Sequence, residues 1–230
     1  MRPYDDRMTL EHDHAAHEHE AHEHEAHEHD HGGHDHGGHD HDHEDHAGHE
    51  HVDYPTAVAM FRTDKDEYFR RAHDSPIPHD QRHDFPGLPY FPVDESLRFE
   101  GLELEPYAGN EPVSFQIPTS DGKLRDAERA GTLSFDLGGA KQRLTGYRFL
   151  KDRSGSVFVP FLDVTSGAET YGAGRYLDLD PDPDDGTYVI DFNLAYHPSC
   201  VYDARFSCPL TPAENRLPVR IEAGERLPEA

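Results

Sequence analysis

The stretch GTLSFDLGGAKQRLTGYRFL, residues 131–150, decides the fold class of this chain. It contains two candidate strands, 131–137 and 142–150, separated by the turn signal Gly138-Gly139. Further candidate strands recur on both sides, at 97–104, 113–117, 156–161, 175–179, 187–192 and 217–222. Because these short strands follow one another without intervening helices, they predict an antiparallel sandwich or barrel rather than a parallel sheet.

One helix is expected before the strands. Asp53 is available as an N-cap and Pro55 stands near the first turn, which favours a helix start here. Apolar residues then recur at three- and four-residue steps through about residue 72: Val58, Phe61, Tyr68, Phe69 and Ala72. The helix charges are expected to be solvated. The sequence thus predicts a mainly β domain over 53–230, preceded by a tail at 1–52.

Residues 11–51 are a low-complexity segment of another kind. They hold 17 of the 21 histidines and 14 of the 47 acidic residues, with no Lys, Arg or large apolar side chain. The segment repeats with a period of five, as in AHEHE at 16–20 and 21–25. Since it has nothing to bury against the entropy of ordering, we expect it to be disordered.

This segment is well supplied with metal ligands. Neutral imidazole suits Zn, Ni, Cu and Co, and at four ligands per ion the rings can fill roughly four sites. We expect exchangeable Zn or Ni, held without unique geometry. The candidate ligands are His12, His14, His17, His19, His22, His24, His27, His29, His31, His34, His36, His39, His41, His43, His46, His49 and His51. The alternatives are a solvated acidic tail with no metal role, and a pH sensor.

The net charge of −26 disfavours polyanionic partners. Such a chain repels nucleic acid phosphates and anionic membrane surfaces, so neither is an expected partner. Only four of its 21 basic residues are lysine. An acidic, lysine-poor chain suits molar salt, where the Debye length falls to about 3 Å, so a salt-loving host is a hypothesis. With no apolar leader or membrane span visible in the sequence, the expected location is cytoplasmic.

Four motifs carry a resemblance to a known family. They read FVPFLDVTSG at 158–167, ETYGAGRYL at 169–177, DFNLAYHPSC at 191–200 and CPLTPAENRL at 208–217. They resemble the family numbered 1684 among the domains of unknown function, over about residues 57–226. The resemblance implies one domain and supplies no activity. The histidine-rich segment lies outside the family pattern.

Polar residues within these motifs form a candidate pocket. It comprises Asp163, Thr165, Glu169, Tyr171, Arg175, Asp191, Asn193 and Tyr196. Nearby glycines allow close backbone approach to a ligand, and the Arg175 guanidinium is a fork suited to a carboxylate. One alternative is that this carboxylate belongs to an anionic ligand. The other is that it belongs to Asp163 or Asp191, and the cluster then only braces a long loop.

Two cysteines and one histidine form a second candidate group. His197, Cys200 and Cys208 could supply three ligands to one zinc ion. The alternatives are a disulfide, a pair of buried thiols, or a cysteine nucleophile. The sequence has no nucleophile elbow, phosphate loop or dinucleotide fingerprint.

Three functional hypotheses follow. The first is a metal-handling protein whose tail buffers or delivers Zn or Ni, with a β-domain that binds a small molecule or a protein partner. The second is an enzyme that orients an anionic substrate on Arg175, with Asp163 or Asp191 as acid or base. The third is a non-catalytic scaffold whose polar cluster is structural.

Overall fold

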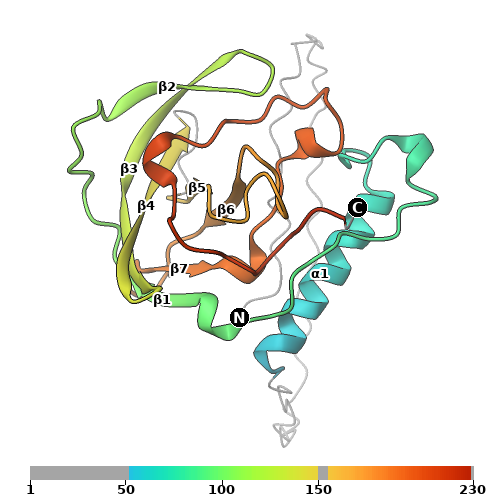
Figure 1. Ribbon diagram of the computed structural model, residues 1–230, viewed down its shortest axis with the longest axis horizontal. Helices are drawn as coiled ribbons and strands as arrows, with labels where there is room; N and C mark the ends of the chain where they lie inside the picture. The colour runs from blue at the N-terminus through green and yellow to red at the C-terminus, as the bar shows by residue number, and fades with distance from the viewer. Residues whose placement is uncertain (1–51, 150–154, 229–230) are drawn as a thin grey trace, which may run out of the picture. The chain divides into compact units, whose positions relative to one another are not determined.

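The computed structural model describes residues 52–149 and 155–228, all within one unit, His49–Ala230. This part is mainly β, with antiparallel sheets and one α-helix, as predicted (Figure 1). Its elements are α1 (Tyr54–Arg71), β1 (Arg98–Leu102), β2 (Ser114–Pro118), β3 (Leu124–Leu137), β4 (Ala140–Phe149), β5 (Val157–Phe161), β6 (Arg175–Leu179) and β7 (Tyr188–Asp191). The prediction of a disordered tail concerns residues outside the described part. No helix in the described part is long and apolar enough to cross a membrane.

The larger sheet has the strand order β2-β3-β4-β5-β6, and β1 pairs with β7 in a second, two-stranded sheet. The hairpin of β3 and β4 turns at Gly138 and Gly139, with φ values of 66° and 75°. That left-handed conformation suits glycine, because a side chain there would be strained. Strand β3 starts seven residues earlier than predicted, since its first half pairs with β2 and a register shift lies between Arg129 and Gly131.

The predicted strand at 217–222 is wrong. This segment is irregular, although Ile221 is completely buried. It runs beside residues 162–164, where the Leu217 amide donates to the Leu162 carbonyl at 2.7 Å. Pro218 has no N–H to donate, which interrupts a ladder at this point. The Val219 carbonyl accepts from the Val164 amide at 3.0 Å, and the side chains of Asp163 and Arg175 pair with the Ile221 amide and carbonyl.

The core lies between the two sheets and this irregular segment. Phe161 of β5 and Phe192, just after β7, are completely buried, and their ring centroids are 5.1 Å apart in an edge-to-face arrangement. Phe135 of β3 adds a third ring, 5.8 Å from Phe192. Full burial of such a side chain contributes about 1.5–3 kcal/mol. The aromatic contacts thus tie the two sheets together.

Helix α1 starts and packs as its sequence predicts. The Asp53 carboxylate accepts from the Thr56 amide at 2.9 Å, which caps the N-terminus. Val58 and Phe69 are buried, and Phe69 meets Tyr202 edge to face at 5.3 Å. The expectation that the helix charges are solvated is wrong for Lys65, whose side chain is only 13% exposed.

Candidate functional site

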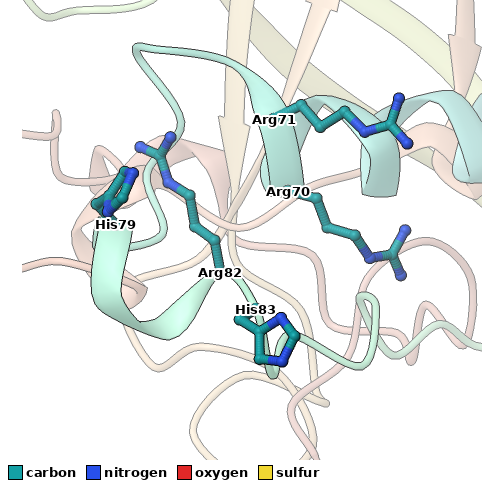
Figure 2. Close-up of a pocket in the computed structure, with 5 residues that line it drawn as sticks. All are labelled: Arg70, Arg71, His79, Arg82 and His83. Carbon is teal, nitrogen blue, oxygen red and sulfur yellow. The ribbon is translucent and has the colours of Figure 1, made fainter.

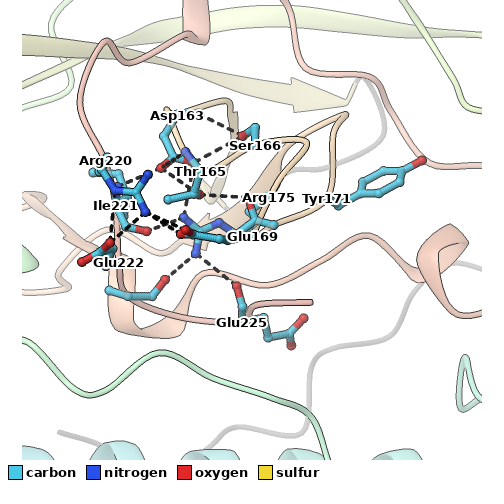
Figure 3. A network of polar contacts seen from close by, with 12 residues as sticks. Asp163, Thr165, Ser166, Glu169, Tyr171, Arg175, Arg220, Ile221, Glu222 and Glu225 are labelled. Carbon is cyan, nitrogen blue, oxygen red and sulfur yellow. Dashed lines mark hydrogen bonds and ion pairs between the residues drawn. The ribbon is translucent and has the colours of Figure 1, made fainter. Parts of the chain in front are cut away.

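Arg175 lies at the start of β6 with its side chain fully enclosed. Its guanidinium donates to the carbonyls of Ala223, Ile221 at 2.8 Å and Glu225 at 3.2 Å (Figure 3). It also pairs with the Asp163 carboxylate at 3.4 Å. Burial lowers the pKa of Arg175, and Asp163 opposes that shift. The Arg175 guanidinium therefore satisfies backbone carbonyls of the C-terminal segment that a neighbouring strand would otherwise pair.

Asp163 completes this network from the loop after β5. Its carboxylate accepts from the Thr165 hydroxyl at 2.9 Å and from the Ile221 amide at 2.8 Å. The Thr165 hydroxyl also lies 3.0 Å from that of Thr170. Both carboxylate oxygens of Asp163 and two of the three guanidinium nitrogens of Arg175 bond within the protein, although the buried Arg175 Nε has no partner. The arrangement therefore favours an internal brace over a ligand pocket at Arg175.

The other predicted pocket residues lie elsewhere. Glu169 forms an exposed ion pair with Arg220 at 2.6 Å, at the edge of the same loop. Tyr171 points away from the buried network, as Figure 3 shows. The Tyr196 hydroxyl donates to the Asp178 carboxylate. Glu169, Tyr171 and Tyr196 thus make separate contacts and do not line a shared pocket with Arg175.

Asp191 and Asn193 form a further network near the N-terminus of α1. The Tyr54 hydroxyl donates to the Asp191 carboxylate at 2.8 Å, and the Asn193 amide group donates to the Tyr54 oxygen at 2.9 Å. Asn193 also donates to the Asp94 carbonyl at 2.8 Å. Burial and Asp191 raise the pKa of Tyr54. This network attaches α1 to β7, so the eight predicted residues do not converge on one site.

A buried carboxylate that the sequence analysis missed lies at the centre of another cluster. Glu225 is 1% exposed, and its carboxylate pairs with the Lys65 ammonium at 2.7 Å. It also accepts from the His197 amide at 2.7 Å and from the Tyr202 hydroxyl at 2.9 Å. The Lys65 ammonium lies 4.5 Å from the centroid of the Tyr196 ring. This cluster joins α1 to the C-terminal segment.

The protonation states within the Glu225 cluster follow from burial and charge. Burial would raise the pKa of Glu225, but Lys65 and His197 lower it, and the net shift is downward. Burial lowers the pKa of His197 to about 4, against the opposing effect of Glu225. His197 is therefore neutral at pH 7, and the Lys65 ammonium is the cation in direct contact with the Glu225 carboxylate.

The predicted His197–Cys200–Cys208 group is only partly assembled. His197 accepts a hydrogen bond from the Tyr171 amide through Nε2 at 3.2 Å, which occupies one of its two possible ligand nitrogens. In the described part of the chain, no group of three or more His, Cys, Asp or Glu side chains is placed to hold a metal ion. The two cysteines do lie together as free thiols, with Cys200 partly exposed and Cys208 buried.

Arginine and histidine side chains surround an open depression of about 430 Å³ at the end of α1 (Figure 2). They are Arg70, Arg71, His79, Arg82 and His83. Arg82 donates to the carbonyls of Ile77 at 2.8 Å and Ala72 at 2.7 Å, and Arg71 pairs with Glu67 at 2.7 Å. The guanidiniums of Arg71 and Arg82 thus serve the local fold, and Figure 2 shows that the side chains do not point toward a common centre.

Together, these features define a mainly β domain braced by buried ion pairs and holding two adjacent thiols. The chain belongs to the family described as "Protein of unknown function (DUF1684)", whose model matches residues 83–226. The predicted resemblance is confirmed, and α1 precedes the matched region.

A solved structure supports the same fold. The chain is 41% identical to an uncharacterized protein from Haloarcula marismortui solved by solution NMR, with a TM-score of 0.57. The similarity covers 75% of this chain and 93% of that one. No curated protein matches the chain.

Proposed function

We propose that this protein binds divalent transition-metal ions through residues 11–51 and acts as a buffer or delivery protein for Zn or Ni. The observation that carries the proposal is the density of ligands: 17 histidines and 14 carboxylates within 41 residues, many as His-x-His. In an extended chain this spacing puts both rings on one side, so a pair can close on one ion. Intervening glycines let distant pairs fold back onto the same ion.

The folded domain supports this proposal as a stable carrier. The Arg175–Asp163 pair makes most of its hydrogen bonds within the fold, which favours a structural role for that cluster. In this proposal the folded domain contacts a small molecule or protein partner, and residues 11–51 bind the Zn or Ni ions. A cytoplasmic, salt-adapted setting agrees with the acidic, lysine-poor composition. The same charge disfavours nucleic acid and anionic membranes as partners.

Calorimetry on the full chain with Zn²⁺ and Ni²⁺ tests the proposal. At pH 7.5 we expect several weak, exchangeable sites, roughly four tetrahedral ions for each chain. Because protons compete for imidazole nitrogen, affinity should fall sharply below about pH 6.

Two full-length variants separate the ligands from the charge. In the first, the 17 histidines of residues 11–51 become glutamine; in the second, the 14 carboxylates become amides and the histidines stay. We expect the first variant to lose nearly all zinc uptake and the second to keep most of it. The absence of zinc or nickel heat from the unmodified chain, or unchanged uptake by the first variant, would overturn the proposal.

A further inference from the structure

The two thiols lie where three separate parts of the chain meet. The Cys200 amide donates to the Cys208 sulfur at 3.3 Å, which holds the buried sulfur against the backbone of the partly exposed cysteine. The Cys208 amide in turn donates to the Ser120 hydroxyl at 3.1 Å, in the turn between β2 and β3. Tyr171, from the loop before β6, hydrogen-bonds with Cys200. The pair is thus held in place by residues distant in sequence.

The surroundings of the two sulfurs differ in a way that divides their roles. A hydrogen bond from Cys208 lowers the pKa of Cys200 to about 6 against the opposing effect of burial, with further hydrogen bonds from Ser120 and Tyr171. The hydrogen bond to Cys200 and burial raise the pKa of Cys208. The thiolate of the pair therefore forms on Cys200, while Cys208 keeps its proton. The partly exposed sulfur is the nucleophile, and the buried thiol donates a hydrogen bond to it.

We propose that Cys200 and Cys208 form a reversible thiol–disulfide site that reacts with hydroperoxides. The inference is independent of metal binding by residues 11–51. In the first step the Cys200 thiolate attacks one peroxide oxygen, an S–O bond forms and the O–O bond breaks. Cys200 is oxidised to a sulfenic acid, and the peroxide is reduced to hydroxide or alkoxide, which takes a proton from solvent. The Ser120 and Tyr171 hydroxyls orient the thiolate before this step.

The second step uses the neighbouring thiol. The Cys208 sulfur attacks the Cys200 sulfur, the S–S bond forms, the S–O bond breaks, and the Cys208 proton leaves with the hydroxide as water. A dithiol reductant reverses the reaction by thiol–disulfide exchange and is itself oxidised to a disulfide. Because the two cysteines already touch, closure needs only a local movement of a nine-residue loop.

Hydrogen peroxide and the full-length, chelator-treated protein provide the test. Mass spectrometry should show loss of two hydrogens and two free thiols per chain, with both restored by dithiothreitol. Alkylation of the reduced protein by iodoacetamide should label Cys200 first, with a midpoint near pH 6. At pH 6.5 the rate should exceed that of a free cysteine roughly tenfold, since a larger thiolate fraction outweighs the lower nucleophilicity of a low-pKa thiol.

Two variants distinguish the proposed roles. Cys208→Ser should stop at the sulfenic acid, which dimedone traps on Cys200. Tyr171→Phe, a matched change that removes one hydroxyl, should raise the alkylation midpoint and slow the peroxide reaction several-fold while the disulfide still forms. If both thiols of the unmodified protein stay reduced in peroxide, or if Cys200 alkylates no faster than a free cysteine, the proposal is wrong.

Discussion

The substitution Asp163→Asn tests the brace at the centre of the domain. It removes one charge and almost no volume, and it leaves the enclosed Arg175 guanidinium without a counter-ion. Breaking one partner of a buried pair costs about 3–5 kcal/mol, because the remaining charge is uncompensated. A domain of this kind is stabilised by about 5–15 kcal/mol in all. We therefore expect a large loss of stability, equivalent to a fall in Tm of roughly 10 °C.

Urea unfolding of the full chain at fixed salt measures this loss as a lower midpoint with an unchanged slope. The matched control is Glu169→Gln, which breaks the exposed ion pair with Arg220 in the same loop and should cost less than about 1 kcal/mol. In a double variant with Arg175→Met, no unpaired charge remains. The combined loss should then be smaller than the sum of the two single losses by at least about 1 kcal/mol.

The outcome decides between a brace and a pocket. If Asp163→Asn costs less than about 1 kcal/mol, Arg175 is not held by this carboxylate, and the internal role assigned to the pair is refuted.

Two further predictions concern pH and salt. His197 has a folded-state pKa of about 4 against an unfolded value of 6.5, so the unfolded chain binds the additional proton between these values. Its contribution, roughly 3 kcal/mol, is present above pH 6.5 and is lost as the pH falls toward 4. Urea midpoints at pH 7.0, 5.5 and 4.5 should show this loss in the unmodified chain, and His197→Gln should lack it. If the urea midpoint falls equally with pH in both proteins, His197 is not the cause. Molar KCl should raise Tm by screening the net charge of −26, and equal stability with and without salt would contradict a salt-adapted host.

Much of the fold was predictable because its determinants are local. The hairpin at 131–150 follows from two strand-like runs around Gly138 and Gly139. The helix start follows from Asp53, whose carboxylate caps a backbone amide three residues on. Segment 217–222 was not predictable in the same way. Its backbone groups pair with Arg175 and Asp163, which lie about 50 residues away, so its strand-like composition did not produce a strand.

For the candidate site, too, the residue types could be chosen from the sequence but their contacts could not. Of the polar residues chosen from the motifs, five are buried, Tyr171 and Tyr196 are half-buried and Glu169 is exposed, and they belong to several networks rather than to one pocket. The cluster around Glu225 had no sequence signal, because its cation, Lys65, lies 160 positions earlier on a helix. Only the fold brings the two charges together.

The sequence alone determined the family, the mainly β class and the ligand content of residues 11–51, because these depend on local pattern and composition. The tertiary structure decided which polar groups are satisfied internally and which atoms surround the Cys200 sulfur. Hydrogen bonds and ion pairs act over a few ångströms in space, and the residues that make them here are separated by tens of positions along the chain.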